Sequence, residues 1–188
     1  MIWFCCNHLT LSEPKTKGII FARQLNDLPN LIQDIKISIN KTPISIHNNV
    51  KLLGHIIDST LSWDCHVKHI ISKLSSSIYA MNSCKHILNT ELLKLMYYGF
   101  MYLHLQYGIV LWGGMISGAH KKRLLSFKGR ALKCILSRTT CKRGTDLFTL
   151  GNILDIDNLT KLAFLKFAYR SERQLLPTTI QSFFYSKQ

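Results

Sequence analysis

The pattern of apolar and polar positions over the first 60 residues predicts short β-strands. Lys17–Arg23 is apolar and β-branched at its centre, which predicts a buried strand. Ile35–Ile46 alternates on both sides of the turn-forming segment 40–42, which predicts a hairpin. Val50–Asp58 predicts a further strand, and Gly54 inside it indicates a bulge or a close backbone approach. The N-terminal part is therefore expected to form a small antiparallel sheet.

From residue 61 onward, apolar residues instead recur at the three-and-four spacing of amphipathic helices. A first helix is predicted to begin near Ser62, a suitable N-cap, with Asp64 in its first turn. Asn89 or Thr90 can cap a second helix. The apolar stripe of the first helix comprises Val67, Ile70, Ile71, Leu74, Ile78 and Met81.

Two more helices are predicted over about 119–138 and 157–170, followed by a frayed tail over 171–188. In the third helix Lys128 falls on the apolar side, a conflict that a polar contact would explain. The predicted fold class is α+β, mostly α, with a small antiparallel sheet over 1–60 followed by a helical bundle over 61–170.

The charge changes at the same place. Residues 1–60 carry six basic and four acidic side chains, whereas residues 61–188 carry eighteen basic and six acidic ones. Between Leu92 and Thr145 there are ten Lys or Arg and no acidic residue. The net charge of +14 favours a polyanionic partner such as nucleic acid over a role for the charge in solubility alone. A hydrophobic content of 47% excludes a wholly disordered chain.

Leu95–Ala119 has no formal charge over 25 residues and is long enough to span a bilayer. However, it contains His104, Gln106, five glycines and four tyrosines. This composition favours a central helix of a water-soluble domain, and a single-span membrane protein is the least favoured hypothesis.

The chemistry-bearing residues form no recognised catalytic or metal-binding pattern. The six cysteines include no CxxC pair and no signal peptide is evident, so we expect an intracellular protein of the nucleus or cytoplasm with reduced thiols. Cys65, His66 and His69 could contribute to a zinc site, but a fourth ligand at suitable spacing is missing, so no metal site is predicted. Neither a phosphate-binding glycine loop nor a nucleophile elbow is present.

Six blocks, in order over about residues 3–167, resemble the reverse transcriptases of non-LTR retrotransposons, the jockey-like elements in particular. The central block is VKLLGHIIDSTLSWDCHVKHIISKLSSSIYAM, over 50–81. The upstream block is a spaced pattern that Trp3, Asn7, Leu9, Leu11, Lys15 and Thr16 fill, and it precedes GIIF. The downstream blocks are LMYYGFMYLHLQYGIVLWGG, KGRALKCIL and TTCKRGTDLFTLGNIL.

The resemblance implies a C-terminal fragment of an RNA-directed DNA polymerase: the end of the palm, a primer-grip hairpin, and a helical thumb with its extension. It places Leu52, Leu53 and Gly54 on the primer-grip turn. It places Lys15 near the phosphates of the incoming nucleotide, as a relic of a general acid. Ser12, Pro14 and His55 depart from the family pattern in these two regions.

The catalytic carboxylates of that family are not found. The family enzyme uses Mg²⁺ held by a Tyr-Ala-Asp-Asp turn and an earlier Asp, a turn expected upstream of Met1, whereas this chain has no Tyr-x-Asp-Asp and no adjacent Asp pair. Asp155 and Asp157 come nearest, and their positions are typical of acids at a helix start. We therefore expect neither catalysis nor a cofactor in this chain alone.

The resemblance also implies a partner, namely the backbone of RNA or of an RNA/DNA duplex held by the thumb. A stand-alone basic nucleic-acid-binding module is the alternative hypothesis. Open sheet edges in the palm part predict self-association, and no membrane partner is expected. The candidate nucleic-acid-binding residues are Lys121, Lys122, Arg123, Lys128, Arg130, Lys133, Arg138, Lys142 and Arg143.

Overall fold

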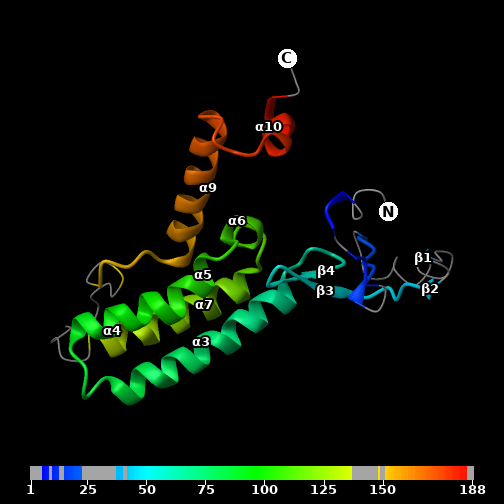
Figure 1. Cartoon of the computed structure of the whole chain (residues 1–188). Coiled ribbons are helices and arrows are strands. Elements are labelled where there is room, and N and C mark those ends of the chain that lie inside the picture. The colour runs from blue at the N-terminus through cyan, green and yellow to red at the C-terminus, as the bar shows by residue number, and fades with distance from the viewer. Residues whose placement is uncertain are drawn as a thin grey trace. The chain divides into compact units, whose positions relative to one another are not determined.

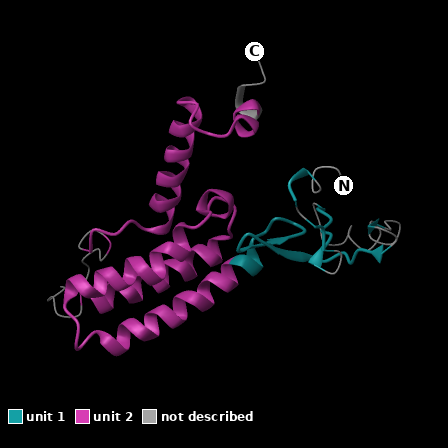
Figure 2. Cartoon of the chain, viewed as in Figure 1, with its two compact units in different colours: residues 1–66 teal, residues 67–188 magenta. Residues whose placement is uncertain are grey.

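The structure is a computed structural model that describes residues 6–8, 10–12, 15–22, 37–39, 42–136, 148 and 151–185. Figure 2 shows its two compact units, residues 1–66 and residues 67–188. The fold is α+β and mostly α, as the sequence predicts (Figure 1). Its strands are β1 (Ser38–Ile39), β2 (Thr42–Pro43), β3 (Asn49–Leu52) and β4 (His55–Asp58). Its helices are α3 (Asp64–Cys84), α4 (Thr90–Met96), η3 (Tyr97–Tyr102), α5 (Leu103–Gln106), α6 (Ile109–Trp112), α7 (Gly118–Ile135), α9 (Ile156–Glu172) and α10 (Thr178–Tyr185).

The described strands of the first unit form two separate antiparallel hairpins, β1–β2 and β3–β4. The hairpin predicted within 35–46 is confirmed by β1 and β2, although residues 35 and 36 lie outside the described residues. The prediction of a buried strand over 17–23 is wrong for the described residues, 17–22. These residues contribute only a single β-bridge, from Gly18 to Ile46.

The strand predicted over 50–58 is also wrong in form, because the chain reverses in its middle. Val50 pairs with Ile57, and Leu52 pairs with His55 across the turn. Leu53 and Gly54 occupy this turn with φ angles of 46° and 86°. Two consecutive residues at positive φ give the twist of a tight hairpin, so Gly54 marks a turn and not a bulge.

Asp58, at the end of β4, closes the loop that leads into α3. Its carboxylate accepts hydrogen bonds from the backbone N–H groups of Ser62, at 2.8 Å, and Trp63, at 2.7 Å. Leu61 and Trp63 adopt positive φ angles of 55° and 63°, each of which costs about 1–2 kcal/mol for an L-residue. Asp58 therefore does more than end β4, because its carboxylate also stabilises a strained loop.

The predicted apolar stripe of the first helix is confirmed: all six of its residues are buried on α3. Asn89 caps α4 by accepting a hydrogen bond from the N–H of Leu92 at 2.9 Å, as predicted. The C-terminal tail is not simply frayed, because 178–185 forms α10.

The uncharged stretch 95–119 is divided into short elements. η3 and α5 continue from α4, and Gly108, at a φ of 60°, then starts α6. Tyr97, Met101, Leu105 and Trp112 are fully buried, so this stretch contributes to the protein core. Within the described part of the chain, none of the helices combines the length and the apolar character needed to cross a membrane.

Candidate nucleic-acid interface

The third predicted helix, α7, carries most of the candidate basic residues. It begins one residue earlier than predicted, and Ser117 caps it by accepting a hydrogen bond from the N–H of His120 at 3.3 Å. It ends at Ile135, three residues before the predicted end. Its buried apolar side includes Leu124, Ala131, Leu132 and Ile135.

Four of the basic residues share one exposed side of α7. At about 100° per residue, Lys122, Lys133, Arg130 and Arg123 fall within a sector about 100° wide, opposite the buried residues. All four side chains are exposed. The guanidinium of Arg130 lies over the ring of Phe127, 4.0 Å from its centroid. We call these four residues the basic stripe.

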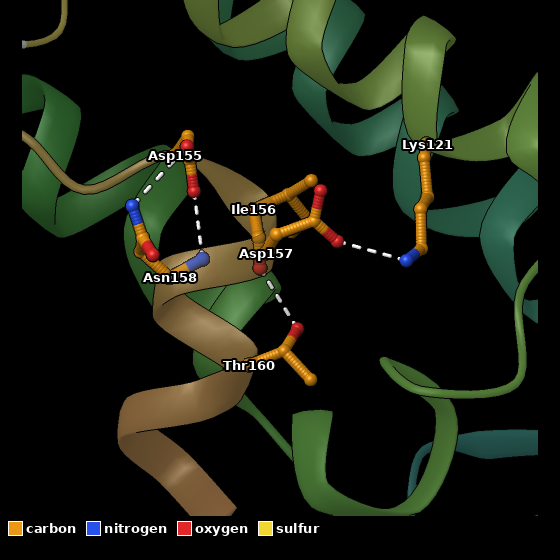
Figure 3. A network of polar contacts seen from close by, with 6 residues as sticks. All are labelled: Lys121, Asp155, Ile156, Asp157, Asn158 and Thr160. Carbon is orange, nitrogen blue, oxygen red and sulfur yellow. Dashed lines mark hydrogen bonds and ion pairs between the residues drawn. The ribbon is translucent and has the colours of Figure 1, made fainter.

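The other two candidates on α7 lie on its apolar side. Lys121 forms an ion pair with Asp157, with 2.8 Å between Nζ and Oδ1 (Figure 3). This pair links α7 to the first turn of α9, so the charge of Lys121 is already compensated within the fold. The prediction that Lys121 binds nucleic acid is thereby weakened.

The prediction that Lys128 contacts nucleic acid is wrong, because its side chain is fully buried. Its ammonium donates a hydrogen bond to the backbone carbonyl of Leu154, which is the polar contact that its place on the apolar side requires. Burial lowers the pKa of Lys128 to about 8, against the opposing effect of the Asp155 carboxylate. Lys128 therefore positions the segment before α9.

Three further candidates, Arg138, Lys142 and Arg143, lie outside the described residues. Lys15 is exposed, and its backbone N–H donates to the carbonyl of Ser12 at 3.1 Å. The Thr16 hydroxyl donates to the same carbonyl at 2.9 Å. These contacts describe a local turn around Lys15 without giving its ammonium a role.

The turn of the β3–β4 hairpin presents two large apolar side chains to solvent. Leu52 is 56% exposed and Leu53 is 81% exposed, and Gly54 completes the turn. Leu52 and Leu53 therefore form an exposed apolar tip on this hairpin. These three residues lie at the end of the hairpin, and their assignment to a primer grip stays a prediction.

The three residues considered for zinc all lie on α3. His66 uses both ring nitrogens: Nδ1 accepts from the backbone N–H of Ile56 at 3.4 Å, and Nε2 lies 3.3 Å from Nδ1 of His55. An accepting Nδ1 leaves the proton on Nε2, which therefore donates to His55. Burial lowers the pKa of His55, and both rings pack beside Trp63. Among the described residues, no three His, Cys, Asp or Glu side chains are grouped closely enough to hold a metal ion.

Asp155 and Asp157, which come nearest to the family's adjacent Asp pair in sequence spacing, do not fit a Mg²⁺ site. Asp155 caps α9 by accepting from the N–H of Asn158 at 2.7 Å, and Asp157 pairs with Lys121 (Figure 3). The interpretation of both as acids at a helix start is confirmed. Each carboxylate is already engaged by a donor of the fold.

Sequence reasoning missed two residues that extend the basic stripe. Asn82, on α3, and Lys85, just after it, line the same shallow hollow as Arg130, Lys133 and Cys134. Some 45 residues separate the two groups in the sequence, so only the packing of α3 near α7 reveals this cluster.

No protein-family model, curated protein or solved structure matches this chain.

Proposed function

We propose that this chain carries the end of the palm, the primer-grip hairpin and the thumb of a non-LTR retrotransposon reverse transcriptase. Its own contribution is to hold the backbone of RNA or of an RNA/DNA duplex, without nucleotidyl transfer. The observation that carries the binding part is the basic stripe of α7, Lys122, Arg123, Arg130 and Lys133.

The dimensions of the basic stripe suit a nucleic-acid backbone. Lys122 and Lys133 are eleven positions apart, which is about 16 Å along a helix axis. Along the axis of a duplex, the phosphates of one strand recur at about 3.4 Å, so the stripe matches the axial length of about four or five of them. Backbone contacts of this kind require charge and reach, and they carry no base specificity. The expected binding is therefore independent of sequence.

The hairpin supports the assignment to the reverse transcriptase family. In the resembled family a turn at this place presses on the primer end, and here Leu52 and Leu53 stand exposed at a tight turn. An apolar tip next to a strand end suits packing against a sugar or a base, whereas a polar loop tip would not. This proposal assigns the tip to the primer and the stripe to the phosphates.

Salt-dependent binding tests the role of the basic stripe. The purified chain is titrated onto a labelled RNA/DNA hybrid at several salt concentrations, and the four stripe residues are changed to Ala together. Each lost phosphate contact reduces the log-log slope by about 0.7–0.9, so the variant slope is expected to fall by about three.

A matched control removes the same number of positive charges elsewhere. Lys68, Lys73, Lys161 and Lys166 are exposed on α3 and α9, and their joint change to Ala leaves the same net charge as the stripe variant. We expect the control slope to fall by less than about one. Equal losses in both variants would show that only the overall charge attracts nucleic acid, and would refute an interface on α7.

Two measurements test the family assignment. The purified chain is expected to show no template-directed incorporation with any metal, because the two-metal mechanism needs carboxylates that this sequence does not supply. The genomic sequence upstream of this chain is expected to encode a Tyr-Ala-Asp-Asp turn, intact or disabled. An upstream region without any such remnant would favour the alternative, a stand-alone nucleic-acid-binding module.

A further inference from the structure

The C-terminal half of α7 and the end of α3 line a shallow, open hollow of about 200 Å³. Lys85, Arg130 and Lys133 line it together with Asn82 and Cys134. No acidic side chain belongs to this lining, and none of the three cations forms an ion pair with a described residue. Three positive charges thus surround one concave site without a described acidic side chain to compensate them, which is a stronger indication of an anion site than a charged helix face alone.

Two of the lining groups are held in place by their neighbours. The guanidinium of Arg130 lies over the Phe127 ring, which restricts its plane. The Cys134 thiol donates to Oδ1 of Asn82 at 3.1 Å. Burial raises the pKa of the Cys134 thiol, against the opposing effect of Lys85, so the sulfur keeps its proton and continues to donate. Because the amide oxygen of Asn82 is engaged, its NH₂ group remains as a donor.

This set of groups matches the chemistry of a phosphate group. Arg presents a planar fork of donors that binds two oxygens of a phosphate, and Lys adds point charges. The Asn NH₂ can donate to a third oxygen. The hollow lies near the C-terminal ends of two helices, where each dipole contributes about half a negative charge. Three full positive charges at closer range outweigh that opposing field.

We propose that Lys85, Arg130, Lys133 and Asn82 form a discrete binding site for one phosphate group, seated between α3 and α7. This inference rests on the proposed function where the phosphate belongs to a nucleic-acid backbone, and it extends that function by one fixed anchoring point. A terminal phosphate monoester offers the same oxygen chemistry, and the experiment separates the two sources.

The first arm uses inorganic phosphate alone with the full chain. The side-chain N–H signals of Asn82 and Arg130 are followed by NMR during a phosphate titration at constant ionic strength. Saturable shifts of both signals are expected. Arg130→Lys keeps the charge but loses the planar fork, and it should weaken phosphate binding about tenfold, as should Lys85→Gln.

Lys73→Gln is the matched control, because Lys73 is exposed on α3 and belongs neither to the hollow nor to the basic stripe. It should change phosphate affinity less than about twofold. Shifts that do not saturate, or equal losses in the control and in both site variants, would overturn the proposal.

The second arm identifies the source of the phosphate and separates this proposal from the proposed function. The chain is titrated with one oligonucleotide bearing either a 5′-phosphate or a 5′-hydroxyl. A monoester site binds the phosphorylated form more tightly, and Arg130→Lys removes that preference. A backbone site binds both forms alike, and Arg130→Lys weakens both. Saturable inorganic phosphate binding without oligonucleotide binding would refute the proposed function and leave this site standing. Oligonucleotide binding that neither Arg130→Lys nor Lys85→Gln changes would refute this site alone.

Discussion

The buried ammonium of Lys128 gives the fold a pH dependence that can be measured directly. Lys128→Met keeps the length and apolar character of the side chain but removes the charge and the hydrogen bond to the Leu154 carbonyl. At neutral pH two effects oppose each other. The variant avoids the cost of burying a charge, but it leaves the carbonyl of Leu154 without its donor, which costs about 1–3 kcal/mol.

The dependence on pH separates these two effects. The pKa of Lys128 is about 8 in the folded chain against 10.5 ordinarily, a difference equivalent to about 3 kcal/mol. Between these two values the unfolded chain binds more protons at Lys128 than the folded chain does. The free energy of unfolding therefore rises with pH across this window, and the gain is lost as the pH falls to about 8.

The assay is urea unfolding followed by circular dichroism, for the parent chain and for Lys128→Met, at several values between pH 7 and pH 10. Other titrating groups are common to both chains and cancel in the difference between them. We expect the free energy of unfolding of the parent, relative to the variant, to rise by about 2–3 kcal/mol over this range.

Lys122→Met is the control, because it removes an exposed ammonium from the same helix. Its difference from the parent should stay flat with pH. A difference that is also flat for Lys128→Met, within about 0.5 kcal/mol, would show that the ammonium is not buried against Leu154 in solution.

Three further substitutions test the local architecture. Burial alone would raise the pKa of Asp58, but hydrogen bonds from Ser62, Thr60 and Trp63 outweigh it and hold the pKa below its usual value. Its stabilising effect is therefore present above about pH 4 and is lost as the pH falls through the folded-state pKa. Asp58→Asn should destabilise the first unit by about 1–2 kcal/mol at pH 7 and remove this acid dependence. The assay is urea unfolding followed by Trp fluorescence. A free energy of unfolding of the parent chain that does not fall in acid would contradict this role of Asp58. A Cβ on Gly113 would lie 2.7 Å from the carbonyl oxygen of Ile109 and from Oγ1 of Thr160, so Gly113→Ala should cost about 1–3 kcal/mol. Gly129→Ala in α7, where no atom obstructs a Cβ, should instead stabilise by up to about 1 kcal/mol, and thermal melts that rank the two variants the other way would contradict the packing of α6 near α9.

The sequence by itself determined the features that depend on near neighbours. The apolar stripe of α3 repeats every three or four residues, and such a stripe can be buried only by an amphipathic helix. Asn89 and Asp155 cap helices because a cap needs only the N–H groups two or three residues further on. The mostly helical fold class follows from the same local rules.

The hairpin of β3 and β4 shows where local pattern is insufficient. Val50–Asp58 is apolar enough to predict one strand, and the pattern alone does not reveal that Leu53 and Gly54 adopt positive φ angles. The paired register of Val50 with Ile57 decides in favour of a turn, because folding back lets both halves satisfy their backbone hydrogen bonds.

Only the tertiary structure decided which basic residues remain available to a partner. In the sequence, Lys121 and Lys122 are equivalent charges on one helix, and Lys128 differs from them only by its place on the apolar side. In the fold, Lys121 meets a carboxylate from α9, Lys128 is buried against a distant carbonyl, and Lys122 remains exposed. Lys85 joins Arg130 only through the packing of α3 near α7. Such contacts link residues far apart in the chain, and no periodicity encodes them.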